Sequence, residues 1–88
     1  MANPALKAAQ KATESIERKY NERVRLGGDK DDAVTDAIKH AYPSLSEDAQ
    51  ADVFGRIRDL FDEFPSGITR KMALGKALRD YAIGRIYG

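Results

Sequence analysis

The stretch SGITRKMALGKALRDYAIGRIY (residues 66–87) constrains the whole arrangement, because it carries apolar residues on two sides of one predicted helix. At about 100° per residue, one face of this helix contains Leu74, Ala77, Leu78 and Tyr81. A second face, nearly opposite, contains Met72, Ile83 and Ile86, with Tyr87 at its margin. A helix that is apolar on two sides either lies at the centre of a bundle or presents one face to another chain.

The preceding segment, residues 46–64, has the heaviest apolar stripe of the chain. Its stripe consists of Val53, Ile57, Leu60, Phe61 and Phe64, and it predicts a helix at the centre of the core. Ser44 with Glu47 has the spacing of a capping box, whereas Ser46 stands nearer the apolar run, so either serine is a candidate N-cap. Pro65 follows the end of the helix.

Two further helices are predicted towards the N-terminus. In residues 4–26 the apolar positions Ala5, Ala9, Ala12, Ile16 and Tyr20 recur at helical spacing. Asn3 is a candidate N-cap before Pro4, and Gly27-Gly28 supplies the left-handed residue on which helices often end. The other helix is predicted over residues 32–42. Pro43 disfavours helical geometry at Tyr42 and so ends this helix. Its inner stripe is Ala33, Val34, Ala37, Ile38 and Ala41.

The sequence therefore predicts an all-α fold, a small four-helix bundle-like single domain over residues 1–88 with helices at about 4–26, 32–42, 46–64 and 68–87. Apolar residues are 42% and charged residues 33% of the 88, which is typical of a globular chain. The absence of Cys and of a secretion-type leader leads us to expect a cytoplasmic protein. No run approaches the roughly 18 apolar residues of a membrane span, so we expect no membrane partner.

Charge is segregated along the chain. Residues 1–30 carry seven Lys/Arg against four Asp/Glu (+3), residues 31–64 carry three against nine (−6), and residues 65–88 carry five against one (+4). Such segregation lets helices attract one another and can also present charged faces to a partner.

Nothing in the sequence indicates an enzyme. His40 is the single histidine and has no cysteine or well-placed serine with which to form a catalytic set. The acidic segment Asp29–Asp32 lacks the glycine and the closing glutamate of a calcium loop, and N-cap chemistry accounts for it. We therefore expect no catalytic residue, metal site, cofactor or small-molecule substrate.

The second face of the 68–87 helix is the strongest functional indication. Apolar residues rimmed by cations are typical of protein interfaces, in which Met, Tyr and Arg are enriched. The predicted partner-binding residues are Met72, Lys76, Arg79, Ile83, Ile86 and Tyr87. The function expected is a small interaction module that binds a larger protein or forms a homodimer. Small regulators and inhibitors, including those of phages and plasmids, are proteins of this size and class.

The alternative is a nucleic-acid-binding protein. Lys7, Lys11, Arg18 and Arg25 lie within about 40° of one another on the first helix, and such a row can follow a phosphate backbone. Arg70 and Lys71 of the last helix are the other candidates, but the five cations of that helix radiate around it instead of forming one row. The pI of about 8.0 and the acidic middle segment favour the protein-binding interpretation, because nucleic-acid-binding domains commonly have a pI above about 9.

Overall fold

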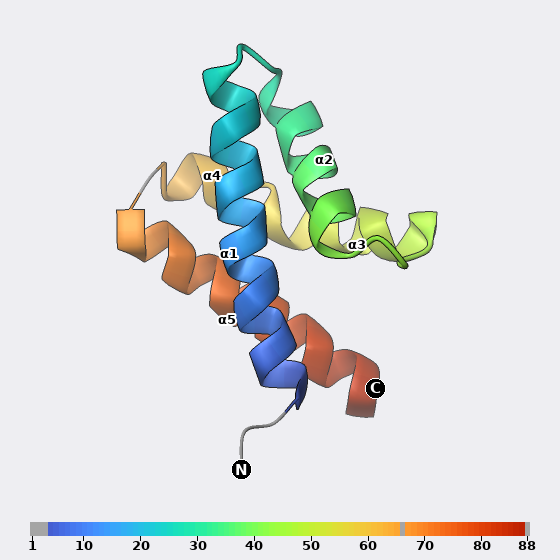
Figure 1. The fold of residues 1–88 in the computed structure, drawn as a ribbon. Coiled ribbons are helices and arrows are strands. Elements are labelled where there is room, and N and C mark those ends of the chain that lie inside the picture. The colour runs from blue at the N-terminus through green and yellow to red at the C-terminus, as the bar shows by residue number, and fades with distance from the viewer. Residues whose placement is uncertain (1–3, 66, 88) are drawn as a thin grey trace.

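The computed structural model describes the backbone of residues 4–65 and 67–87 and the side chains of residues 7–65 and 67–84. Its helices are α1 (Pro4–Arg25), α2 (Lys30–Ala41), α3 (Glu47–Ile57), α4 (Leu60–Glu63) and α5 (Gly67–Tyr87). The described backbone contains no strand, so the all-α prediction is confirmed (Figure 1). No helix in it is long and apolar enough to cross a bilayer. Asn3 lies outside the described residues.

The end of α1 follows the predicted glycine signal. Gly27 has φ of +88°, and its N–H donates to the Val24 carbonyl oxygen at 3.0 Å. The N–H of Gly28 donates to the Arg23 carbonyl oxygen at 2.9 Å. These two bonds satisfy carbonyls that the last turn of a helix otherwise leaves free, and they form a Schellman motif. The chain then reverses direction into α2.

Side-chain caps begin the next two helices. The carboxylate of Asp29 accepts hydrogen bonds from the backbone N–H groups of Asp31 and Asp32 at 3.1 and 3.3 Å. The Ser46 hydroxyl oxygen accepts from the N–H of Ala49 at 3.2 Å. Ser46 is therefore the N-cap of α3, and the Asp29 segment performs the capping role that the sequence predicts.

The predicted helix over 46–64 is interrupted at Arg58–Asp59. After Ile57 the hydrogen bonds tighten to three-residue spacing, from Phe61 N–H to the Arg58 carbonyl oxygen (3.3 Å) and from Asp62 N–H to that of Asp59 (3.1 Å). The single turn α4 follows this tightening. Phe61 then stacks on Tyr20 of α1, with ring centroids 4.0 Å apart.

One hydrophobic core joins α1, α2, α3, α4 and α5. Its most completely buried side chains are Ile16, Val34, Ile38, Val53, Ile57, Leu74 and Leu78. α1 is the central element, because it packs along α2 on one side and crosses α5 on the other (Figure 1). The alanines Ala9 and Ala12 are buried along it and permit close approach. The sequence instead favours residues 46–64 for the centre, since its stripe is bulkier.

Two glycine substitutions should test how α1 ends. No atom lies within 4 Å of a Cβ added at Gly27 or at Gly55, which is an exposed residue inside α3. Gly27→Ala should lower the free energy of unfolding by about 1–2 kcal/mol, because an alanine strains the positive φ. Gly55→Ala should raise it by about 0.8–1 kcal/mol through helix propensity. Urea unfolding followed by circular dichroism measures both, and a shift of the same sign in the two variants would contradict the C-cap assignment.

Candidate interaction surface

The outer face of α5 exposes large apolar side chains. Met72 is 69% exposed and Ile83 is 38% exposed. The opposite face of the same helix is buried in the core through Leu74, Leu78 and Tyr81. α5 therefore has a second apolar face that the described part of the chain leaves largely uncovered. The side chains of Ile86 and Tyr87 lie outside the described residues.

Lys76 and Arg79 lie between these apolar residues along α5. Both are exposed, and Lys76 Nζ pairs with the Asp80 carboxylate at 3.3 Å. Arg79 makes no ion pair with any residue that the structure describes. The structure thus places four of the six predicted partner-binding residues on one accessible strip of α5. The strip is apolar at both ends and cationic in the middle.

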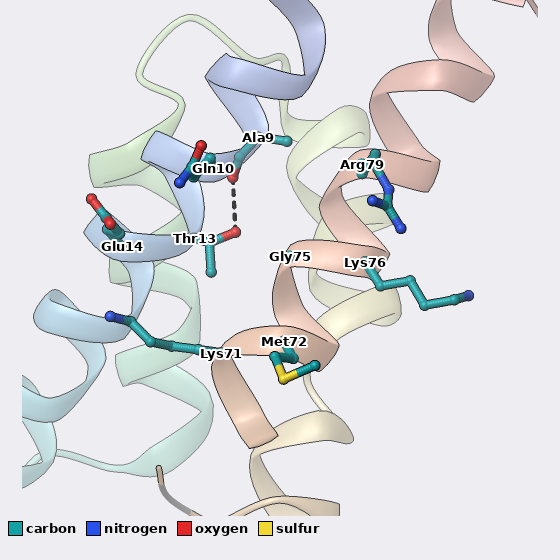
Figure 2. Close-up of a pocket in the computed structure, with 9 residues that line it drawn as sticks. All are labelled: Ala9, Gln10, Thr13, Glu14, Lys71, Met72, Gly75, Lys76 and Arg79. Carbon is teal, nitrogen blue, oxygen red and sulfur yellow. Dashed lines mark hydrogen bonds between the residues drawn. The ribbon is translucent and has the colours of Figure 1, made fainter. Parts of the chain in front are cut away.

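A groove of about 610 Å³ runs between this strip and α1. It is lined by Ala9, Gln10, Thr13 and Glu14 of α1 and by Lys71, Met72, Gly75, Lys76 and Arg79 of α5 (Figure 2). Small residues from both helices form much of its wall, and the Thr13 hydroxyl is satisfied by donating to the Ala9 carbonyl oxygen at 2.8 Å. Covering the Thr13 hydroxyl therefore leaves no unpaired donor at that point of the wall.

A second, smaller groove lies on the other side of the same strip. Arg56 and Leu60, from α3 and α4, line it together with Ala73, Lys76, Ala77 and Asp80 of α5. Lys76 lies at the edge of both grooves, so the outer face of α5 forms a ridge between them. Side-chain rows of this kind on one helix pack into the grooves between the rows of another helix.

The row of cations on α1 that the nucleic-acid-binding interpretation requires is exposed. Lys7, Lys11, Arg18 and Arg25 all face solvent. None of them forms an ion pair within the described part of the chain. Lys71 of α5 is exposed as well, and its side chain extends towards α1 and Glu14 (Figure 2).

Arg70 does not belong to that surface, and the expectation that it contacts nucleic acid is corrected. Only 3% of Arg70 is exposed. Its Nε lies 2.7 Å from Glu17 Oε2, its Nη1 donates to the Pro65 carbonyl oxygen at 2.6 Å, and its Nη2 donates to Asn21 Oδ1 at 2.9 Å. The guanidinium also lies over the rings of Tyr20 and Phe61. A buried side chain whose Nη1 and Nη2 donate within the chain cannot reach a phosphate, and its position on the core face of α5 explains the burial.

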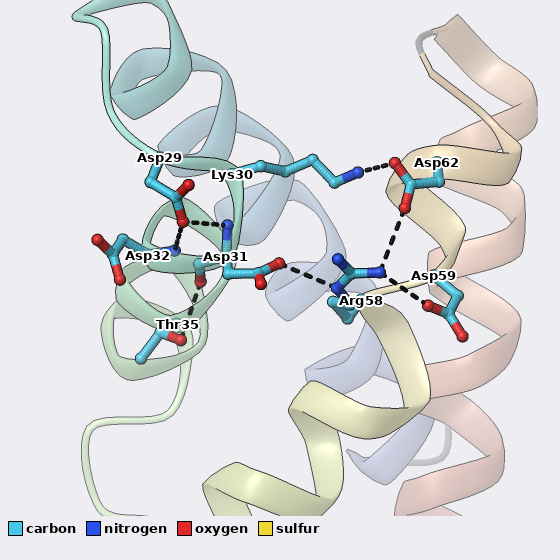
Figure 3. A network of polar contacts seen from close by, with 8 residues as sticks. All are labelled: Asp29, Lys30, Asp31, Asp32, Thr35, Arg58, Asp59 and Asp62. Carbon is cyan, nitrogen blue, oxygen red and sulfur yellow. Dashed lines mark hydrogen bonds and ion pairs between the residues drawn. The ribbon is translucent and has the colours of Figure 1, made fainter.

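Part of the acidic middle of the chain is paired with cations of the same chain. Arg58 contacts Asp31 of α2 as well as Asp59 and Asp62 beside it, and Lys30 pairs with Asp62 (Figure 3). These contacts join the start of α2 to the junction of α3 and α4. Among the described residues, no group of three or more His, Asp or Glu side chains is placed to hold a metal ion.

Sequence reasoning missed part of the surface. Ile68, in the first turn of α5, is 71% exposed and lies four residues before Met72. This spacing by itself predicts that Ile68 belongs to the strip, because residues four apart share a helix face. The contribution of Ala9 and Thr13 to the groove had no such signal, since it depends on how α1 crosses α5.

Arg70→Met should destabilise the fold strongly. The substitution leaves the Glu17 carboxylate buried without its partner, and breaking a buried pair in this way costs about 3–5 kcal/mol. Lys71→Met, at the exposed neighbouring position, should change the free energy of unfolding by less than about 0.5 kcal/mol. Combining Arg70→Met with Glu17→Leu should recover part of the loss. Chemical denaturation measures all three, and equal small effects at positions 70 and 71 would contradict the buried ion pair.

Stability should fall at alkaline pH. Burial raises the pKa of Tyr20 above its ordinary value of 10.0, the Arg70 charge partly offsets this, and Glu17 adds to it. Burial, with Tyr81 nearby, also raises the pKa of Tyr42. Because the unfolded chain releases these protons first, the stabilisation is complete below pH 10 and is lost as pH rises through the raised values.

Urea unfolding between pH 8 and pH 11 measures this dependence. In the Tyr20→Phe variant the free energy of unfolding should fall less steeply with pH, because the phenylalanine ring has no proton to release. A decline as steep as that of the parent chain would show that Tyr20 ionises as easily in the folded protein as in the unfolded one.

Comparison with known proteins yields no relative from which a function could be transferred. No family model matches the chain, and no curated protein or solved structure gives a match.

Proposed function

We propose that this protein is a small interaction module that binds another protein chain on the outer face of α5. The observation that carries the proposal is the exposure of Met72 and Ile83 on one strip with Lys76 and Arg79 between them. Met72 and Ile83 leave apolar surface in water at the two ends of the strip, and burial against a partner would remove it from water. Met and Arg are both enriched at protein interfaces, and both occur on this strip.

The shape of the surface supports the same proposal. The ridge of α5 is flanked by the α1 groove and by the smaller groove beside α3 and α4. A partner side chain entering the α1 groove would contact Ala9, Gly75 and the exposed thioether of Met72. Met is an adaptable contact residue because its unbranched, polarizable side chain repacks readily.

On this proposal the chain acts by occupying a surface, as a regulator or inhibitor does, and it catalyses no reaction. Its occupant is a larger protein or a second copy of the chain. We place this activity in the cytoplasm, because a cysteine-free composition suits a reducing compartment.

Nucleic-acid binding is the second candidate, and the exposed row on α1 favours it. Lys7, Lys11, Arg18 and Arg25 carry four positive charges without an ion-pair partner among the described residues. Arg70 is buried, so Lys71 alone remains of the two α5 cations expected on this surface. The apolar strip has no role in phosphate contact, so protein binding accounts for more of the surface.

Site-specific photocrosslinking in extracts of the source cells tests the proposal. A benzophenone side chain at position 72 should form covalent adducts with a protein, whereas the same group at Lys39, an exposed residue of α2, should not. Ile83→Asp should reduce the adduct from position 72 at least about tenfold, which is about 1.4 kcal/mol of binding. The same variant should retain its helical circular dichroism, because Ile83 is partly exposed.

Three results would count against this function. Equal yields of adduct from positions 72 and 39 would mean that the strip does not bind a partner selectively. Adducts that disappear on nuclease treatment would favour the nucleic-acid alternative. Unfolding by Ile83→Asp, to the extent expected for the fully buried control Leu78→Asp, would place Ile83 in the core.

A further inference from the structure

The exposed strip of α5 has a charge pattern that restricts what can bind it. Met72, Lys76, Arg79 and Ile83 are spaced by four, three and four residues. At about 100° per residue they lie within a sector of about 60°, and this spacing is that of the contact seam in paired helices. The order of residue types along the seam is therefore apolar, cation, cation, apolar.

The two cations are available to a partner to different degrees. Lys76 already contacts Asp80, although both side chains are more than half exposed. Arg79 has no ion-pair partner among the described residues, and Lys71 at the edge of the adjoining groove has none either. Glu14 is the single acidic residue lining that groove, against the cations Lys71, Lys76 and Arg79. The binding surface is therefore positively charged at its centre.

A second copy of the chain is a poor occupant of this seam. The spacing is the same read in either direction, so a parallel pair in register places Lys76 against Lys76 and Arg79 against Arg79. An antiparallel pair in register places Lys76 against Arg79 twice. Both arrangements remove like charges from water next to each other, which opposes association.

A neutral apolar helix is also disfavoured, because it would cover Arg79 without offering an acceptor for its guanidinium. A nucleic acid would satisfy the cations but would leave Met72 and Ile83 without apolar contacts. A helix with carboxylates in the middle and apolar residues on either side satisfies all four positions. Arginine forms paired hydrogen bonds with a carboxylate, which adds orientation to the charge attraction.

We propose that the partner of α5 is an acidic amphipathic helix, with two carboxylates flanked by apolar side chains at the same four, three, four spacing, supplied by a different protein. This inference rests on the proposed function, because it specifies the chemistry of the protein that binds the strip. It assigns Arg79 the central polar contact, and Met72 and Ile83 the apolar contacts at each end.

Fluorescence anisotropy with designed peptides tests this proposal. Three labelled Ala-rich helical peptides of about 20 residues are used. One carries Leu, Glu, Glu and Leu at the complementary spacing. The second replaces both Glu with Lys, and the third replaces both Leu with Ala. The first should bind at least about tenfold more tightly than the other two, and added salt should weaken its binding.

Charge reversal provides the matched control. Arg79→Glu should lose affinity for the Glu peptide at least about tenfold and gain affinity for the Lys peptide. Lys39→Glu makes the same kind of change at an exposed site on α2 and should leave both affinities unchanged. Circular dichroism confirms that both variants fold.

Several outcomes would overturn the inference. They are equal binding of the Glu and Lys peptides, undiminished binding of the peptide without leucines, and an Arg79→Glu variant that behaves like the parent chain. Stronger competition by duplex DNA than by unlabelled Glu peptide would identify a nucleic acid as the occupant. A dimer in sedimentation that Ile83→Asp dissociates would identify a second copy.

The failure of this inference and that of the proposed function are separable. Protein adducts from position 72, together with no binding of the Glu peptide, would retain the interaction module and reject the acidic helix. Absence of adducts from position 72 would reject both.

Discussion

The buried ion pair between Glu17 and Arg70 is the constraint on which the orientation of α5 depends. Both residues are almost completely shielded from water, and the guanidinium is enclosed by the rings of Tyr20 and Phe61. Desolvation cancels much of the attraction in such a pair, so its net effect on stability is small even though neither charge tolerates the loss of the other. Its consequence is geometric, because it ties one edge of α5 to α1 and to the turn at Pro65.

That geometry determines which side of α5 faces outward. Arg70 continues the buried line formed by Leu74, Leu78 and Tyr81, so this line must lie against α1, α3 and α4. Met72, Arg79 and Ile83 are then on the opposite side of the cylinder. The exposed strip is thus a consequence of the core: a helix with apolar residues all around cannot bury both faces when its companions are few and short.

Part of the segregated charge is paired between helices. Lys30 and Arg58 connect the acidic start of α2 to the α3–α4 junction, and Arg23 of α1 pairs with Asp36 of α2 at 3.0 Å. Surface pairs of this kind are individually weak, but they reduce the repulsion that nine acidic residues in one segment would otherwise cause. The cations left over lie on α1 and along α5, where an acidic partner could use them.

The sequence by itself determined the helical class, the apolar part of each inner face and the end of α1. Periodicity placed Ile16, Ile38, Val53 and Leu74 in the core, and Gly27 ended α1, because both signals act within a few residues along the chain. The exposure of Met72 and Ile83 also agrees with the helical pattern.

Only the tertiary structure decided which cations are accessible and where the groove lies. Arg70 looks like a surface residue in sequence, and its burial depends on Asn21, 49 residues away, and on Glu17. The periodicity gives no signal for the break at Arg58–Asp59. The position of Gly75 beside Thr13, whose hydroxyl oxygen would lie 3.7 Å from a Cβ added at Gly75, depends on how α5 crosses α1. Local patterns carry no information about such contacts, because they are set by how whole helices pack on one another.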